Sequence, residues 1–436
     1  MYQFKQIPAR TRFAAVFISL ALSCATIASA AADNNSTRQL SIAELGAVGD
    51  GKTLNTSNIQ AAVNQLAAKG GGTLVIPKGE FLSGAIFLKP GVNVRLDEGA
   101  VLKGSTDTKD YPKTKTRIEG HFEEWLPALI NADKCDHLRI SGSGTLDGCG
   151  EPFYKAFWAA RRADPRVTNL AVERPRLAFI ANSEDVQVSG IHFTNSGFWN
   201  LHLYRCKGVM VENVRFEVPN GMKCPSTDRT DIDSSQNVTI RGCYYSVDDD
   251  CVCLKGSKGP FAMDDKDSPP VEHIRVENCT FERGNGILTL GSEATIVRDV
   301  VVENCKAVGQ VNLAVLKLRP DTPQDYEDIH YRDITLAGTG HAILNVAPWR
   351  QFFDLKGQPP PKSIVKNVTL SNIKGTFGGF GQIVGNVDQT EISDFTLENI
   401  DVQLDNDKLD TSWVKNLTIR NVTVNGKPLA PQLTKQ

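Results

Sequence analysis

Apolar residues recur with a period of two in short runs along most of the chain, and polar turn residues separate these runs. In nine of the runs an apolar anchor is followed by further apolar residues two and five positions later. Glycine, asparagine or aspartate stands four positions after each anchor, which is typical of a tight turn with left-handed backbone. The anchors are Val186, Val209, Val238, Ile274, Val300, Ile329, Val368, Phe395 and Leu417. This repeat, with intervals of 22 to 39 residues, predicts stacked units of short strands.

The runs are too short for the paired helices of a helical solenoid, so the repeat predicts an all-β fold, a parallel β-helix. Parallel crossover connections are overwhelmingly right-handed, which favours a right-handed coil. Equivalent positions of successive coils should stack about 4.8 Å apart. Cys243, Cys279 and Cys305 would then share an interior column, either as buried free thiols or with a disulfide within the column.

The segment 45–105 has a different pattern. Asn55 to Ser57 offers a helix cap, apolar residues follow at helical spacing up to Leu66, and three glycines at 70–72 end the run. We expect a short N-terminal capping helix and the first strands in 45–105, with the remaining coils in 106–436. Residues 31–436 are expected to form a single β-helix domain.

Residues 1–30 have the pattern of an export signal. Basic residues precede an apolar run over 13–24, and small residues precede a predicted cleavage site near Ala30 and Ala31. The run is too short to span a bilayer, and no longer run follows. We therefore expect an exported monomer, periplasmic or extracellular, with no membrane span.

Loss of this segment removes three positive charges from the formal net charge of −2 and leaves −5. This mild acidity gives no indication of nucleic-acid binding, and a polyanionic ligand would need a local basic patch.

Acidic residues are concentrated between Ser226 and Lys255, beside a short strand in which Val252 and Leu254 point inward. One interpretation is a solvated acidic loop or a calcium site, because Asp-rich loops bind hard cations through oxygen. The other is a set of catalytic carboxylates. Alignment of three coils places Lys317 level with Cys253, and Arg319 level with Lys255. These cations would share one face with Asp228, Asp249 and Asp250.

Carboxylates flanked by cations in a groove fit the cleavage of an acidic polysaccharide. Glycoside hydrolysis needs one protonated carboxyl group, which donates to the leaving oxygen, and one carboxylate. Closely placed aspartates meet this need without a cofactor or a metal, because their mutual repulsion raises one pKa.

Four sequence blocks, in order, resemble the signature of glycoside hydrolase family 28, the polygalacturonases and related pectinases. The family shows Asn-Thr-Asp, Asp-Asp-Cys, Gly-His-Gly and Arg-Ile-Lys blocks. The corresponding blocks here are Ser226-Thr227-Asp228, Asp249-Asp250-Cys251, Gly284-Asn285-Gly286 and Lys317-Leu318-Arg319. The resemblance implies a right-handed β-helical, inverting hydrolase. Asp249 would be its general acid, and Asp228 and Asp250 would position and deprotonate water.

The chain departs from the family pattern where Asn285 replaces the histidine, because asparagine cannot titrate. The order of arginine and lysine in the fourth block is also reversed. Together with Gly291-Ser292-Glu293, these departures resemble pectinases that act on rhamnogalacturonan or on chain ends. The expected substrate-binding residues are Lys317, Arg319, Asn285, Asp231, Lys255, Glu293 and His202.

We therefore predict a pectin hydrolase that cuts at galacturonic acid in homogalacturonan or rhamnogalacturonan. One alternative is a polysaccharide lyase, which would use calcium and a basic residue. Another is a carbohydrate-binding β-helix without catalysis. The walls of the cleft are expected in the longer connections, at 149–176, 219–227, 256–271 and 346–362.

Overall fold

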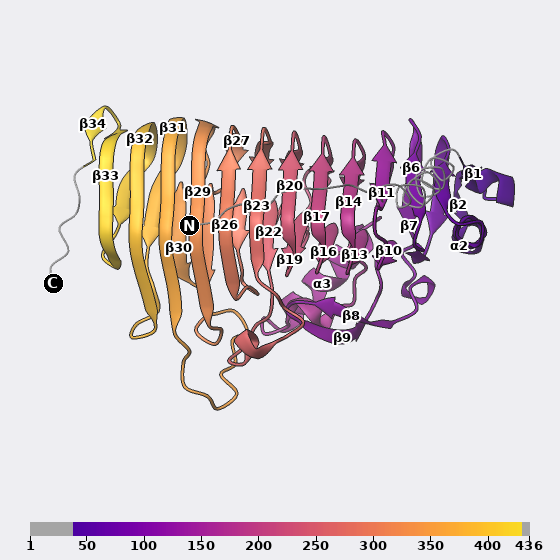
Figure 1. Ribbon diagram of the computed structural model, residues 1–436, viewed down its shortest axis with the longest axis horizontal. Coiled ribbons are helices and arrows are strands. Elements are labelled where there is room, and N and C mark those ends of the chain that lie inside the picture. The colour runs from indigo at the N-terminus through magenta and orange to yellow at the C-terminus, as the bar shows by residue number, and fades with distance from the viewer. Residues whose placement is uncertain (1–37, 430–436) are drawn as a thin grey trace, which may run out of the picture.

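A computed structural model describes residues 38–429 and shows a right-handed parallel β-helix (Figure 1). The predicted export signal lies outside the described residues. One sheet of 32 strands winds along the described chain, and its pairings are parallel except at the C-terminal β33–β34 pair. A separate antiparallel hairpin joins β8 (Thr114–Ile118) and β9 (His121–Trp125). No helix within residues 38–429 is long and apolar enough to cross a membrane.

The strands form three columns along the solenoid. The first contains β5 (Ile86–Phe87), β10 (Ile130–Asp133), β13 (Ala178–Ala181), β16 (Leu201–Tyr204), β19 (Thr230–Asp233), β22 (Val252–Lys255), β25 (Leu288–Leu290), β28 (Ala314–Leu318) and β30 (Leu344–Pro348). The second contains β1 (Gln39–Ser41), β3 (Gly72–Ile76), β6 (Val92–Leu96), β11 (Arg139–Gly142), β14 (Glu184–Ser189), β17 (Lys207–Glu212), β20 (Gln236–Arg241), β23 (Val271–Glu277), β26 (Ile296–Glu303), β29 (Gln324–Ala337), β31 (Ser363–Ile383), β32 (Thr390–Asp410) and β33 (Val414–Val424), which pairs with β34 (Lys427–Pro428). The third contains β2 (Asp50–Leu54), β4 (Gly79–Ser83), β7 (Ala100–Gly104), β12 (Thr145–Asp147), β15 (His192–Thr194), β18 (Arg215–Glu217), β21 (Tyr244–Ser246), β24 (Thr280–Arg283) and β27 (Lys306–Gln310).

The nine-fold repeat is confirmed residue by residue. Each anchor from Val186 to Leu417 is the direct parallel partner of the next anchor along the chain. All nine turn residues four positions later, from Gly190 to Asn421, have a positive φ between 52° and 75°. The repeated spacing therefore encodes both the strand and the left-handed turn that ends it.

The predicted helix is α2 (Thr56–Ala68), which buries Ile59, Ala62, Val63 and Leu66 against the first coils. The predicted cap differs in detail, because the Asn55 side chain makes no capping hydrogen bond. Its amide instead accepts from the Val48 backbone N–H and donates to the Val48 and Thr53 carbonyls. Asn55 thus ties the turn before the helix to the preceding strand.

The core is one continuous column of apolar side chains. Phe193, Phe216, Tyr245 and Phe281 stack in successive coils with ring centroids 5.0 Å apart at each step. The nine cysteines of the described chain are free thiols, and the column of Cys243, Cys279 and Cys305 is buried. The thiol alternative is therefore confirmed, and the three cysteines pack as small apolar groups.

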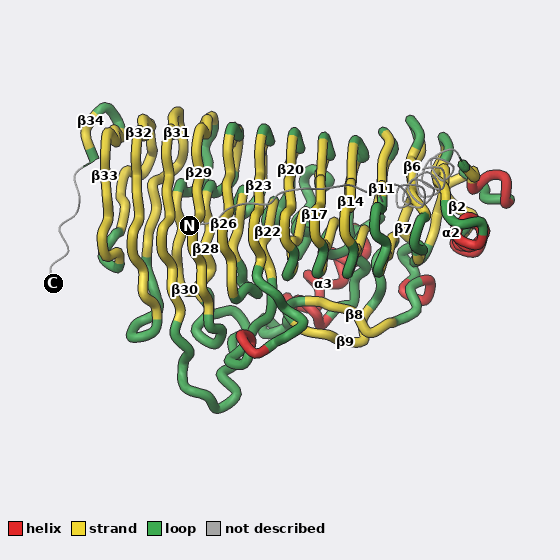
Figure 2. The backbone as a smooth tube through the Cα atoms, in the orientation of Figure 1, coloured by secondary structure: helices red, strands yellow, loops and turns green. Residues whose placement is uncertain are grey.

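The long insertions gather along one edge of the solenoid (Figure 2). They include α3 (Glu151–Ala163), the β8–β9 hairpin and the connection after β30. Four short 3-10 turns complete the described elements: η1 (Ile42–Leu45), η2 (Thr108–Asp110), η3 (Asn169–Ala171) and η4 (Ala262–Asp264).

Candidate active site

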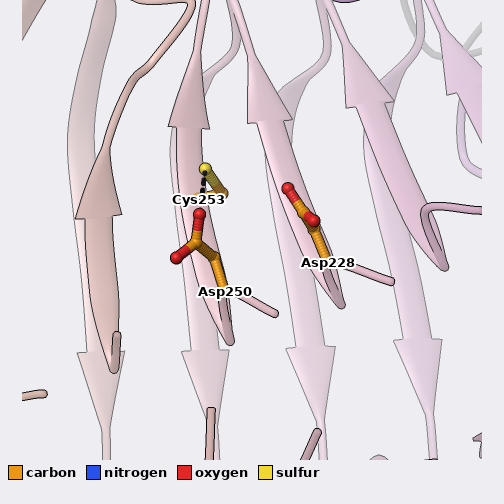
Figure 3. Close-up of side chains that lie close together, drawn as sticks. All are labelled: Asp228, Asp250 and Cys253. Atoms are coloured by element: carbon orange, nitrogen blue, oxygen red, sulfur yellow. Dashed lines mark hydrogen bonds between the residues drawn. The ribbon is translucent and has the colours of Figure 1, made fainter. Parts of the chain in front are cut away.

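Two neighbouring coils bring the acidic residues together just before β19 and β22. Thr230 pairs with Val252, so Asp228 and Asp250, each two residues earlier, lie level with each other. The Arg229 N–H donates to the Asp250 carbonyl at 3.1 Å and extends the ladder to this point. Figure 3 shows the two carboxylates at corresponding places in adjacent coils, with Cys253 beside Asp250. The sheet register alone therefore aligns these acids.

Each of the two aspartates has its own lysine. Lys255 Nζ lies 3.0 Å from Asp228 Oδ2, and Lys317 Nζ lies 2.7 Å from Asp250 Oδ2. The Thr289 hydroxyl also donates to Asp250 Oδ1 at 2.8 Å. Two carboxylates thus stay ion-paired side by side although both are buried.

Asp249 has no lysine within ion-pairing distance in the described chain. Its Oδ1 accepts from Asn285 Nδ2 at 2.9 Å and from the Asp250 backbone N–H at 3.0 Å. Burial, together with repulsion from Asp228 and Asp250, raises the pKa of Asp249 to about 8. One carboxyl of the cluster is therefore protonated at neutral pH.

Lys255 is the centre of the buried charge network. Besides Asp228, its ammonium lies 3.4 Å from Asp231 and 3.6 Å from Glu293, and 4.3 Å from the centre of the Trp199 ring. Burial lowers the Lys255 pKa, but nearby negative charges, Asp228 and Glu293 among them, raise it further, so the ammonium keeps its charge. Lys255 and Lys258 in turn lower the pKa of Glu293.

A cavity of about 310 Å³ opens over these groups. Trp349 lines it, with its ring centre 4.7 Å from Lys317 Nζ. Of the ten expected site residues, seven line this cavity: Asp228, Asp249, Asp250, Lys255, Asn285, Glu293 and Lys317. The furrow predicted from stacked coils thus contains both lysines and all three acids.

Three expected substrate-binding residues do not line the cavity. Asp231 is fully buried beneath Lys255, where burial raises its pKa. His202 is also fully buried, and burial lowers its pKa to about 4. Its Nδ1 accepts from Arg176 at 2.7 Å and its Nε2 lies 3.3 Å from Asp233. Both residues therefore support the floor of the cleft from inside the protein.

Arg319 is the third of these residues, and the expected coil alignment was wrong by two positions. Leu290 pairs with Leu316 and Val252 is level with Ala314, so Lys317 stands level with Lys255. Arg319 lies further along and forms a two-point ion pair with Asp321, with both N–O distances 2.8 Å. A slip of two keeps every side chain on its own face, so alternation alone could not detect it.

Three of the four expected connections contribute walls. Phe157, Trp158, Arg161 and Asn169 come from 149–176, Lys223 to Ser226 from 219–227, and Trp349 and Gln351 from 346–362. The fourth, 256–271, instead packs on the β8–β9 hairpin, where Arg117 bonds to Ser257 at 3.0 Å. That hairpin supplies a wall residue the pattern did not predict, Glu119 at its turn. The local feature of the sequence that could have indicated this turn is the glycine that follows Glu119, because both residues have a positive φ.

The grouping of Asp228, Asp250 and Cys253 also resembles a cation site, because one donor atom from each lies within 4.8 Å of the others. The donor set does not suit calcium, which takes six to eight oxygen ligands, since one member is a thiol. The two lysines already provide positive charge for both carboxylates. The calcium interpretation therefore finds no support in the residues.

Proton donation by one carboxyl group beside ionised neighbours is the chemistry of glycoside hydrolases, and fold and cleft place the chain in this class. The family model described as glycosyl hydrolases family 28 matches residues 68–426. The chain belongs to this family and is a glycosyl hydrolase.

Named relatives agree with this assignment. An exopolygalacturonase of Zea mays is 28% identical over 353 residues, which cover 77% of this chain and 76% of the relative. A probable polygalacturonase of Vitis vinifera is 26% identical over 307 residues, 68% of this chain and 60% of that longer relative. The crystal structure of an exopolygalacturonase from Thermotoga maritima has a TM-score of 0.74 at 23% identity, covering 90% of this chain and 93% of that one. This last likeness shows the fold.

Proposed function

We propose that this hydrolase cleaves pectin at galacturonic acid units, with inversion and from a chain end. The main support is the position of Asp249, whose pKa is raised to about 8, beside two lysine-paired aspartates in one cleft. Asp249 donates its proton to the leaving glycosidic oxygen, and Asp228 and Asp250 position and deprotonate the attacking water. The polygalacturonase names of the relatives support the galacturonan substrate.

The insertions support action at a chain end. α3 precedes β13, and the 349–362 segment follows β30. The strands β13 and β30 are six steps apart in their column, or about 29 Å. The two insertions nevertheless meet, because the Arg161 guanidinium lies 5.6 Å from the centre of the Phe352 ring. This contact restricts one side of the cleft, as expected for an enzyme that admits only a chain end. The name of the Zea mays relative, an exopolygalacturonase, agrees with this proposal.

The proposal is tested with wild type and Asp249→Asn on homogalacturonan and on rhamnogalacturonan. Wild type should release reducing ends from homogalacturonan as mono- or disaccharides from the start. The variant should lose about 10²- to 10⁴-fold in kcat with an unchanged circular dichroism spectrum, because it has no proton to donate. A folded Asp249→Asn protein that keeps full activity would refute the assignment of the general acid, and long intermediate products would refute chain-end action.

The same assay separates the lyase alternative. A lyase produces an unsaturated sugar with ultraviolet absorbance and loses activity with a chelator, whereas hydrolysis gives neither result. Export, a single domain over 31–436 and a monomeric state remain part of the proposal. Sizing of the secreted protein and sequencing of its N-terminus test them.

A further inference from the structure

Some of the positive charges that line the cleft have no negatively charged partner in the described part of the protein. Within residues 38–429, four cations line the cavity, and Lys255 and Lys317 are paired with catalytic aspartates. The remaining two, Arg161 and Lys223, have no carboxylate within 4.0 Å. Acids elsewhere on the wall are already neutralised: Glu119 by Lys258 at 3.2 Å, and Asp248 by Arg283 at 3.4 Å. Two cations are therefore available to an anionic ligand.

Arg161 is held by aromatic rings instead of by an anion. Its guanidinium carbon lies 5.2 Å from the centre of the Phe157 ring and 5.6 Å from that of Phe352. One long hydrogen bond, 3.4 Å from Nη2 to Asn169 Oδ1, is its only polar side-chain contact in the described chain, and its Nε is buried without a partner. Ring contacts on this scale orient a guanidinium and leave its N–H groups free to donate.

Lys223 is oriented in a similar way on the adjoining wall. Its ammonium lies 4.6 Å from the centre of the Trp158 ring, and Trp158 Nε1 donates to the Lys223 carbonyl at 2.7 Å. The next residue, Cys224, is fixed by its N–H, which donates to Asp248 at 2.9 Å. Trp158 and Lys223 thus form a contacting pair of ring and cation, and both residues line the cleft.

We propose that Arg161 and Lys223 bind the carboxylate of a uronic acid unit next to the bond that is cut, with Trp158 packing on its ring. This inference rests on the proposed function and adds a specificity element outside the four family blocks, on the inserted segments 149–176 and 219–227. The enzyme then discriminates in favour of a free carboxylate over its methyl ester at this unit, because an ester offers no charge to the two cations.

Binding tests the inference separately from turnover. Calorimetry is done on the Asp249→Asn protein, alone and combined with Arg161→Gln, Lys223→Gln, or both. The ligands are trigalacturonic acid and its fully methyl-esterified form. Each cation removed should weaken trigalacturonate binding about 10-fold or more and leave binding of the ester unchanged. Added salt should weaken the parent more than the double variant.

Arg166→Gln is the matched control, since it removes the same charge from the same insertion at an exposed residue paired with Asp164. It should bind like the parent, and Arg161→Lys should recover part of the affinity. The Arg161→Gln and Lys223→Gln proteins must first show the parent's melting temperature. The inference is overturned if they then bind trigalacturonate as tightly as the parent, or if their affinities for trigalacturonate and for its methyl ester fall equally. It also falls if the parent does not bind trigalacturonate at all. If the substitutions change binding as expected but the wild-type protein releases no reducing ends, only the proposed function is refuted.

Discussion

At the scale of single residues, the site depends on one aspartate that differs from its neighbours. Asp228, Asp249 and Asp250 have the same chemistry, but only Asp249 lacks an ammonium partner within 4.0 Å in the described chain. Burial and the two adjacent carboxylates raise its pKa to about 8, whereas an ordinary aspartate titrates near 3.8. The raised pKa, which suits the proposed general acid, therefore depends on which two of the three aspartates have a lysine partner.

This pKa gives a prediction for the pH profile. As the proposed general acid, Asp249 can donate a proton only in its protonated form, which predominates below about pH 8. We expect kcat/KM on trigalacturonate to fall about tenfold per pH unit above pH 8, because this ratio reports the ionisation of the free enzyme. Initial rates between pH 4 and 10 check this. A decline that begins near pH 4 to 5 would mean that Asp249 is not raised, and would contradict the assignment.

The sequence indicates which residue types form the site, but not whether each side chain lines the cleft or is buried beneath it. The three aspartates, Lys255 and Lys317 follow from the blocks and from the stacking of coils. His202 alternates correctly on its strand, yet it is buried beside Phe179 and bonded to Arg176. Only the folded insertions above it decide that it lies beneath the cleft instead of in it.

At the scale of elements, insertions and not coils shape the cleft. Arg319 and Asp321 anchor the segment after β30, since Arg319 donates to the Gln351 and Phe352 carbonyls at 3.2 Å and the Asp354 N–H donates to Asp321 at 2.7 Å. Gln351 lines the cavity and Phe352 meets Arg161. We therefore propose that Arg319 acts on the site as a positioning residue.

Arg319→Met tests this role. Loss of one partner leaves the buried Asp321 unpaired, so we expect a loss of about 3–5 kcal/mol in the free energy of unfolding, with a raised KM and a larger share of long products. Denaturant unfolding and product chromatography measure both effects. Arg332→Met, which breaks an exposed pair with Glu303, is the control and should cost about 1 kcal/mol or less. If the Arg319→Met protein is destabilised but gives an unchanged product pattern, Arg319 stabilises the fold and has no effect on the site.

Insertions are also where sequence reasoning reached its limit. The repeat carries its own register, but α3 and the β8–β9 hairpin belong to no repeat and meet their partners over long sequence separations. The two-residue slip of the third coil arose because Ala314 and Leu316 are both apolar and point the same way. The sequence does not single out Arg161 and Lys223 for another reason. Both lie in insertions, and their shared place on the cleft wall appears only once these insertions are folded.

At the scale of the whole molecule, stability comes from identical positions stacked along the axis. The period of two and the turn glycine or asparagine predict this architecture well, because each coil repeats the same local chemistry and pairs only with its neighbours. Phe216 lies in the middle of the aromatic stack, fully buried between Phe193 and Tyr245. Damage there should spread to the adjoining coils that carry the acids.

Phe216→Ala should therefore lower the free energy of unfolding by about 3–5 kcal/mol through the cavity it leaves. Phe216→Leu should lose less, because it refills most of the volume. Hydrogen exchange should show the added opening in the coils around β18 before the ends of the solenoid respond. A uniform increase along the whole chain would instead indicate that the solenoid unfolds as one unit.

Inverting hydrolysis is tested most directly by proton NMR of the fresh reaction of wild type with a galacturonic acid oligomer. We expect the new reducing end to appear first with the anomeric configuration opposite to that of the cleaved bond, and then to mutarotate, because water attacks from the face opposite the leaving group. Product that first appears with the original configuration, or an unsaturated sugar in place of a new reducing end, would contradict it.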